Sequence, residues 1–359
     1  MIAGITKEWT ESEEIRECFD NPGESMSIGN TNHPLKHFGL APLFAPEEGT
    51  TVVEPLGNDE GWWAGAPSAV YDDETRKFYL YYRLRRPRGL ELERGGECVI
   101  SESDDGLAFT PIWSAKKTDF ESDSMERSAL VKGLDGSWRL YNSYTDPVHK
   151  MWRTDYMEAS SPDGFKPSER NPLFDPADMG IEGIKDPYVF TVGGEYQMIL
   201  SYATRIEDME VGREGEIHAT ADAYNTGLTV SRTGLATSID GRHFKWQGDI
   251  FSPTGKGWDA WCRRICSVVY LDGVFTAFYD GASDVSGNYE ERTGIASGRD
   301  MRSLTCLTPD APALVSPHAT GSLRYVDAIQ FPRKIHYYYE YVRADGSHEL
   351  RANVVPVVS

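Results

Sequence analysis

The chain has 359 residues, of which 40% are hydrophobic and 12% aromatic, and 36 Lys and Arg against 56 Asp and Glu give it a formal net charge of −20. An apolar content of this size predicts a large buried core rather than disorder. The negative charge makes nucleic acid and anionic membrane surfaces unfavourable partners. No apolar run approaches the roughly 20 residues of a membrane-spanning helix, so no membrane partner is expected.

The N-terminal region differs in composition from the rest of the chain. Its first 20 residues contain neither the basic start nor the apolar stretch of a secretory signal. Residues 10–19 predict a short helix, which Ser12 would cap before a Glu-rich first turn. We interpret residues 1–37 as an N-terminal extension and residues 38–359 as one domain.

The five cysteines are an odd and scattered set in a large chain, which is typical of free thiols in a reducing compartment. Cys262 and Cys266 lack a second pair of Cys or His at a matching interval, so no zinc site is indicated. The sequence therefore predicts a cytoplasmic protein with no metal and no redox cofactor.

A pattern of apolar strand, tight turn and aromatic strand recurs along the chain. Successive copies are about 60 residues apart, except for one longer interval, in which about residues 205–227 form an insertion. The turns contain Asp-Gly or Gly-Gly pairs, which two-residue hairpins favour because both positions need positive φ. The aromatic strands begin at Phe78, Trp138, Tyr196, Phe275 and Ile335.

Two further elements repeat in phase with these hairpins. A Ser, Asp-Gly, aromatic motif occupies residues 103–109, 161–165 and 238–244, and a connector that usually contains proline recurs five times. The fifth repeat ends without this motif, so we expect an N-terminal segment to close it. Units of about 60 residues with four short strands are typical of propeller blades, whereas a β-sandwich would require the spacing to repeat by chance. The predicted fold class is all-β, a five-bladed β-propeller with a short N-terminal extension.

Charged residues stand where the first strand of each unit begins. In a propeller these positions converge on the central cavity. Buried charges need partners, so these residues either serve a ligand or pair with one another and hold the blades together. The charged positions are Glu126 and Arg127 in the second repeat, Lys185 and Asp186 in the third, Asp259 and Arg264 in the fourth, and Arg324 and Asp327 in the fifth.

One of these segments resembles a known enzyme superfamily. Residues 185–190, Lys-Asp-Pro-Tyr-Val-Phe, followed by Gly-Gly-Glu-Tyr at 193–196, resemble the inner blade motif of the five-bladed propeller glycoside hydrolases of families 43, 32, 68, 117 and 130. The segments at 103–109 and 238–244 are similar to that group as well. The resemblance covers about residues 40–355 as architecture and implies a glycoside hydrolase.

The resemblance carries over a single functional residue. Family 43 uses a basic Asp in blade one, an Asp-Pro carboxylate in blade two and a Glu acid in blade three. Asp186 matches the Asp-Pro motif, although it lies in the third repeat. Ala66 stands where the base would be, and Ile265 and Cys266 stand where the fourth repeat would offer a Glu.

Glycoside cleavage needs one carboxylic acid to protonate the leaving oxygen and a second carboxylate to activate water or attack carbon. We predict Glu126 as the general acid, because a neighbouring apolar wall or carboxylate can raise its pKa. Asp186 or Asp259 would then act as the base or nucleophile. If Glu126 and Asp186 can both be replaced without loss of turnover, this assignment fails.

A local group of basic residues in a protein of net charge −20 also calls for an explanation. We align Arg127, Arg264 and Arg324 at one position, which Lys185 occupies in the third repeat. Guanidinium groups can hold a carboxylate, a sulfate or sugar hydroxyls, and aromatic rings can stack on sugars. The alternative is that the basic groups only pair with the axial acids. The predicted substrate-binding residues are Trp63, Arg83, Arg127, Lys185, Arg264, Arg324 and Asp327.

The sequence thus predicts a glycosidase of carbohydrate metabolism or polysaccharide degradation that cleaves a terminal bond to a pentose, a deoxy sugar or an anionic sugar. An inverting phosphorylase, in which the arginines would bind phosphate, and a non-catalytic carbohydrate-binding propeller stay open as alternatives. A sialidase-like enzyme is a further alternative, although such folds carry six blades. An axial calcium ion is compatible with an acidic cavity, but no spacing indicates one, and the sequence does not indicate an oligomeric state.

Overall fold

The computed structural model describes residues 39–206 and 215–357. The predicted extension at 1–37, with its helix at 10–19, lies outside the described residues, as does part of the predicted insertion. Helical segments among the described residues are single turns of three or four residues. They are η1 (Pro46–Glu48), η2 (Lys117–Phe120), η3 (Pro167–Glu169), α2 (Pro176–Met179), η4 (Ala223–Asn225) and η5 (Val285–Gly287).

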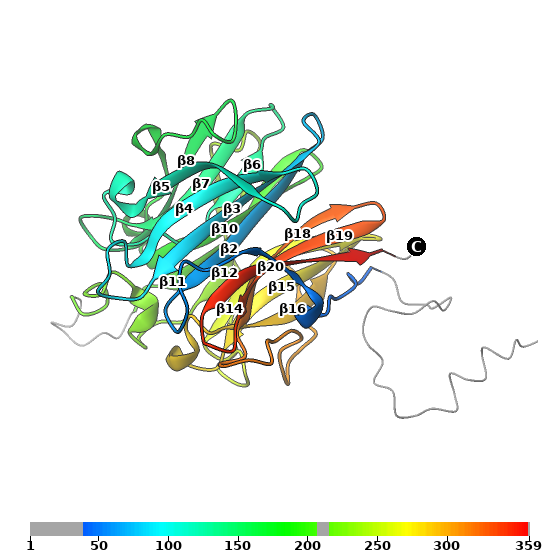
Figure 1. Ribbon diagram of the computed structural model, residues 1–359. Helices are drawn as coiled ribbons and strands as arrows, with labels where there is room; N and C mark the ends of the chain where they lie inside the picture. Colours follow the sequence, from blue (N-terminus) through cyan, green and yellow to red (C-terminus); the bar gives the residue numbers. More distant parts are fainter. Residues whose placement is uncertain (1–38, 207–214, 358–359) are drawn as a thin grey trace, which may run out of the picture.

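The strands form antiparallel units of four (Figure 1). The first unit contains β2 (Trp63–Asp72), β3 (Lys77–Arg86), β4 (Arg94–Ser103) and β5 (Thr110–Lys116). The second contains β6 (Ala129–Lys132), β7 (Trp138–Thr145), β8 (Trp152–Ala159) and β9 (Asn171–Phe174). The third contains β10 (Ile181–Val192), β11 (Glu195–Thr204), β12 (Arg232–Ser238) and β13 (Lys245–Phe251). The fourth contains β14 (Cys262–Leu271), β15 (Val274–Ala282), β16 (Arg292–Gly298) and β17 (Thr305–Cys306).

The fifth unit is completed by a strand from the other end of the protein. It contains β18 (Leu323–Phe331), β19 (Lys334–Val342) and β20 (His348–Pro356), and β1 (Thr50–Val53) pairs antiparallel with β20. In Figure 1 the blue N-terminal segment accordingly runs beside the red C-terminal strand. The prediction that an N-terminal segment closes the last repeat is confirmed.

The first strands of the units are neighbours in a closed circuit. β2 contacts β6, β6 contacts β10, β10 contacts β14, β14 contacts β18, and β18 contacts β2. A single bridge between Trp63 and His348 also joins the first unit to the fifth. The fold is therefore all-β and propeller-like, with the first strands around a common centre.

Turn chemistry and packing explain why the sequence forms these units. Asp272 and Gly273 have φ of 49° and 82°, as a tight hairpin between two strands requires. The aromatic strands then pack one unit on the next: Tyr79 and Tyr81 of β3 lie in one buried cluster with Leu140 of β7. The predicted Gly and Asp turns and aromatic hairpins are confirmed.

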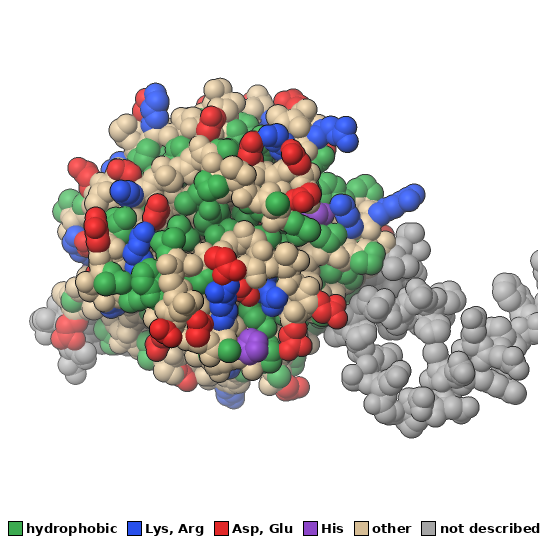
Figure 2. All heavy atoms as spheres, viewed as in Figure 1, with side chains coloured by type: hydrophobic (Ala, Val, Ile, Leu, Met, Phe, Trp, Pro, Cys, Tyr) green, Lys and Arg blue, Asp and Glu red, His purple; other side chains and the backbone are tan. Residues whose placement is uncertain are grey.

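The surface carries the acidic excess in a dispersed form. On the face shown in Figure 2, acidic side chains are spread among Lys, Arg and hydrophobic groups. No helix in the described part of the protein has the length and apolar character to cross a bilayer.

Candidate functional site

The register of the inner hairpins brings charged residues together at the centre. Lys185 of β10 pairs across the ladder with Ser201 of β11. At the same position of the fourth unit, Arg264 faces Asp280. These cross-strand neighbours place their side chains on the same face of the sheet. The corresponding pairs in the first and fifth units are Gly65 with Arg83 and Arg324 with Glu340.

The second unit places a carboxylate at this position. The backbone N–H of Glu126 donates to the carbonyl of Ser143, 2.9 Å away, and Ser143 is the residue of β7 that corresponds to Ser201. Glu126, not Arg127, therefore occupies the position of Lys185. The predicted alignment of Arg127 with Arg264 and Arg324 is wrong by one residue.

Inner strands of the third and fifth units have an extra residue just beyond the aligned position. The ladder shifts register between Lys185 and Tyr188 and again between Arg324 and Asp327. Asp186 and Tyr325 lie in these bulges with φ of 57° and 52°. Such left-handed backbone costs a non-glycine residue on the order of 1 kcal/mol, and bulges commonly redirect side chains beside functional sites.

The hydroxyl of Tyr325 joins two carboxylates from different units. It lies 3.4 Å from Oε2 of Glu126 and 3.4 Å from Oδ1 of Asp186. The two carboxylate oxygens are consequently separated by no more than twice that distance. The structure thus brings Glu126 and Asp186 together, both almost fully buried, with 3% and 1% of their surface exposed.

Basic groups surround this pair of carboxylates. Arg83 forms an ion pair with Glu126, and Nζ of Lys185 lies 3.7 Å from Oε1 of Glu126 and 3.8 Å from Oδ2 of Asp186. Burial acts to raise the pKa of Glu126, but the positive charges of Arg83 and Lys185 outweigh it and lower that pKa to about 2. The expectation that the pKa of Glu126 is raised is therefore wrong.

Three further carboxylates, which the sequence analysis missed, neutralise the other axial arginines. Arg264 donates to Oδ2 of Asp280 from Nε at 3.2 Å and from Nη2 at 2.9 Å, and Nη2 also donates to Glu291 at 3.2 Å. Arg324 donates to Glu291 and to Glu340, each at 2.6 Å. Asp280 and Glu340 lie as many residues after the start of their aromatic strands as Arg83 does after the start of its own. This shared position in the sequence repeat could have marked them as axial residues.

Asp280 is the carboxyl of this group that can hold a proton near neutral pH. Burial raises its pKa to about 6, because the lowering by Arg264 does not compensate for the loss of solvent and for the charge of Glu291. Its Oδ1 accepts a hydrogen bond from the backbone N–H of Tyr325 at 2.9 Å. Tyr325 therefore contacts Asp280 through its backbone and Glu126 through its hydroxyl.

Asp259 does not join the axial carboxylates. Its Oδ2 accepts from Nε of Arg263 at 2.7 Å and from the hydroxyl of Tyr279 at 2.8 Å. Among the described residues it makes no hydrogen bond or ion pair with Glu126 or Asp186. The structure gives no support to its predicted role as base or nucleophile.

Arg127 and Asp327 form a separate buried pair that links units. Nη2 of Arg127 lies 3.6 Å from Oδ2 of Asp327, and Nε donates to the carbonyl of Pro67 at 2.9 Å. Oδ2 of Asp327 accepts from the backbone N–H of Ala69 at 2.7 Å. These contacts join the first, second and fifth units and match the alternative that axial charges hold the blades together.

Aromatic side chains cover the axial group. The guanidinium of Arg85 lies against the rings of Trp63 and Tyr289, at 3.8 and 4.5 Å from their centres. Nζ of Lys185 faces the rings of Trp152 and Tyr224 at 4.9 and 4.7 Å. Trp63, predicted to stack on a sugar, already has Arg85 over its ring. A ligand reaches the axial carboxylates only when part of this cover moves.

Some hydrogen-bonding capacity remains unused at the centre. Oδ2 of Asp186 and Nη2 of Arg324 are buried and have no hydrogen-bond partner in the described part of the protein. An acceptor and a donor of this kind suit hydroxyl groups. The described residues contain no group of three or more His, Cys, Asp or Glu arranged to hold a metal ion.

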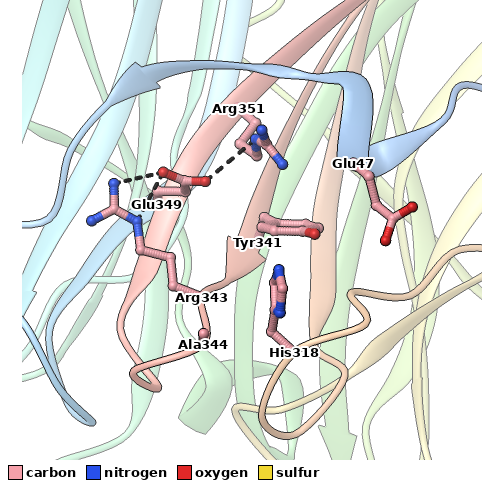
Figure 3. A pocket seen from close by; sticks show the side chains of 7 residues that line it. All are labelled: Glu47, His318, Tyr341, Arg343, Ala344, Glu349 and Arg351. Carbon is pink, nitrogen blue, oxygen red and sulfur yellow. Dashed lines mark hydrogen bonds and ion pairs between the residues drawn. The ribbon is translucent and has the colours of Figure 1, made fainter.

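Two hollows lie outside the axial group. The first, of about 320 Å³, is on the fifth unit, where Glu349 accepts from Nη2 of Arg343 at 2.6 Å and lies 3.3 Å from Nε of Arg351 (Figure 3). Its charges are therefore largely paired. The second hollow, of about 300 Å³, is lined by Arg88, Glu93, Arg94, Lys117, Asp123, Lys150 and residues 219–221.

Comparison with known proteins identifies the fold. No family model and no curated protein matches the sequence. Among solved structures, the protein is similar to a glycosyl hydrolase from Bacteroides ovatus, with 13% identity over 90% of this sequence and 97% of that one and a TM-score of 0.59. A thermostable family-43 glycoside hydrolase gives 13% identity, coverage of 86% and 93%, and a TM-score of 0.58. A third structure is named "The GH130 family of mannoside phosphorylases contains glycoside hydrolases that target beta-1,2 mannosidic linkages in Candida mannan". It gives 14% identity over 88% of this sequence and 96% of that one, with a TM-score of 0.57. The protein therefore shares its fold with these solved glycoside hydrolase structures.

Proposed function

We propose that this protein is a five-bladed β-propeller glycosidase that hydrolyses a terminal glycosidic bond of a small carbohydrate at its axial group. The observation that carries the proposal is the hydroxyl of Tyr325, which contacts Glu126 and Asp186 at 3.4 Å each. Two carboxylates held close together are what glycoside hydrolysis requires. The likeness in fold to glycoside hydrolases supports the same conclusion.

Five units and a closed circuit of first strands support the blade number. The circuit from β2 through β6, β10, β14 and β18 back to β2 has five members, and each leads a unit of four strands. Radial repetition of this kind leaves only short strands at the outer edges, such as β9, β17 and β1.

The pKa directions assign roles that differ from the sequence prediction. Asp280, whose pKa is raised to about 6, is the proton donor to the leaving oxygen. Glu126, whose pKa is lowered to about 2, is the carboxylate that takes a proton from water or attacks the anomeric carbon. Asp186 holds the Tyr325 hydroxyl from the other side.

A non-catalytic carbohydrate-binding propeller is the second candidate function. The observation in its favour is that the axial charges are buried and paired, with Arg85 and Tyr289 over them. Such a site recognises a sugar without supplying a free acid.

A panel of aryl glycosides and oligosaccharides, assayed with and without phosphate, tests the proposal. Glu126→Gln and Asp186→Asn should each lose turnover by a factor of about 100 or more, while Asp310→Asn, a change at an exposed acid, should keep it. Wild-type turnover in both axial variants would refute the assignment. Binding of a glycoside without turnover would establish the second candidate, and strictly phosphate-dependent turnover would make the enzyme a phosphorylase.

A further inference from the structure

The hollow of about 300 Å³ between the first two units is unusually basic for this protein. Four basic side chains and two carboxylates line it, in a protein whose net charge is −20. The lining residues come from the β3–β4 connection and the start of β4, from η2 and the segment after it, from the β7–β8 connection, and from the region that precedes η4. A local excess of positive charge in an acidic protein focuses anions toward it.

The two carboxylates do not neutralise this hollow. Asp123 pairs with Lys150 at 2.7 Å, and Glu93 accepts from the backbone N–H of Gly89 at 2.5 Å. Nζ of Lys117 donates only to the backbone carbonyls of Glu93 and Asp123, each at 3.1 Å. Lys117 therefore has no carboxylate partner among the described residues.

Two arginines add to the excess. Arg94 is buried, and its guanidinium donates to the carbonyls of Thr220 and Ala221 at 3.0 and 3.2 Å. Arg88 is exposed and has no hydrogen bond or ion pair within the described part of the protein. Burial lowers the pKa of Lys117, and the positive charge of Arg94 lowers it further. The negative charge of Glu93 acts in the opposite direction but does not outweigh burial.

The hollow is connected to the axial group through backbone hydrogen bonds. Arg94 precedes Gly95, whose carbonyl accepts from the N–H of Met125 at 2.9 Å, and Met125 directly precedes Glu126. The carbonyl of Met125 also accepts from Arg83 at 3.1 Å. One side of the hollow is thus connected by a backbone hydrogen bond to the residue before the proposed carboxylate.

The other side of the hollow leads to the aromatic cover. Ala221 directly precedes Asp222, whose carboxylate accepts from Nε1 of Trp152 at 3.2 Å and from the hydroxyl of Tyr289 at 2.5 Å. Trp152 and Tyr289 are two of the rings over the axial group. The lining of the hollow is thus connected, through Asp222, to two rings of this cover.

The axial arginines themselves have no charge to spare for an anion. The charges of Arg264 and Arg324 are compensated by Asp280, Glu291 and Glu340, although Nη2 of Arg324 has no hydrogen-bond partner among the described residues. From these observations we propose that the basic hollow binds the carboxylate of an anionic carbohydrate whose neighbouring sugar reaches the axial group. This deepens the proposed function and rests on it. Arg88 supplies the free guanidinium, while Arg94 and Lys117 fix the positive wall.

Titration calorimetry at low salt with D-glucuronate, inorganic sulfate and D-glucose tests the proposal on the full chain. D-glucuronate should bind, D-glucose should not bind at the same concentrations, and Arg88→Gln should weaken D-glucuronate binding about tenfold. Arg333→Gln is the matched control, since Arg333 is an exposed arginine with no side-chain partner among the described residues. Higher salt should weaken the interaction.

Three results would overturn the proposal: no binding of D-glucuronate, equal affinities in Arg88→Gln and wild type, or affinity for sulfate equal to that for D-glucuronate, which would mark a general anion site. Failure of the hollow and failure of the catalytic proposal are distinguishable. Glycoside turnover without D-glucuronate binding would refute only the proposed anion site, whereas Arg88-dependent binding without any turnover would refute only the proposed glycosidase activity.

Discussion

Glu126 and Lys185 stand at equivalent positions of neighbouring units, carry opposite charges, and approach to 3.7 Å between Oε1 and Nζ. This position is negative in the second unit and positive in the third, fourth and fifth, where Lys185, Arg264 and Arg324 occupy it. Each member is buried, so each depends on its neighbours for compensation of its lost hydration.

Glu126→Gln should destabilise the fold by about 3–5 kcal/mol, because removal of one partner from a buried ion pair leaves an uncompensated charge on Arg83. Urea unfolding followed by circular dichroism measures the change. Glu102→Gln is the control, since Glu102 forms a pair with Lys77 that is partly open to solvent, and it should alter the midpoint little. Equal midpoints in the two variants would show that the axial pair is solvated.

Asp280 should make the protein less stable as pH rises from about 4 to 6. Its pKa is about 6 in the folded state against an ordinary value of 3.8, so within this range the folded state holds a proton that the unfolded state has released. The free energy of unfolding should then fall by roughly 3 kcal/mol across the range. Asp280→Asn should remove this fall, which denaturant titrations at four pH values from below this range to above it would detect.

Glu126 should have the opposite effect at lower pH. Its pKa of about 2 lies below the ordinary value of 4.5, so the ionised carboxylate stabilises the folded state above pH 4.5. This stabilisation is lost as the pH falls from 4.5 toward about 2. Acid unfolding of Glu126→Gln should be shallower than that of the wild type in this range. Parallel acid-unfolding curves would contradict the lowered pKa.

If Asp280 is the proton donor, turnover should decline above about pH 6, where its carboxyl ionises. The rate profile of the wild type on an aryl glycoside with a poor leaving group should show this alkaline limb. Asp280→Asn should lose most of the rate on that substrate and less on one with a good leaving group, which needs no protonation. A uniform loss on both substrates would assign Asp280 a structural role.

Gly65→Ala should be strongly destabilising, although it adds only a methyl group. A Cβ at Gly65 would overlap the carboxylate of Glu340, which Arg324 and the N–H of Ala66 hold in place. Gly164→Ala is a suitable control, because a Cβ there has no contact closer than 3.3 Å. Thermal unfolding of both variants should show a large decrease for the first alone.

The fold was more accessible from the sequence than the site. Hairpins such as that at Asp272 and Gly273 depend on neighbouring residues, so their turn chemistry is visible locally. The axial group depends on register between strands, and the segment before Glu126 gives no local marker of where its strand aligns. The sequence pattern consequently aligns Arg127 with Lys185, although Glu126 occupies that position in the structure. Asp280 and Glu340 were missed because they lie within aromatic strands rather than at strand heads.

The pairing of β1 with β20 sets an order of events during synthesis. Thr50 is made about 300 residues before its partner Ala352. Four units can assemble as they emerge, while β1 waits until β20 has been made. Completion of the fifth unit thus needs a contact of very large sequence separation, which is expected to be slow. A truncated protein lacking β20 would leave both this strand and the edge of β19 open to other molecules.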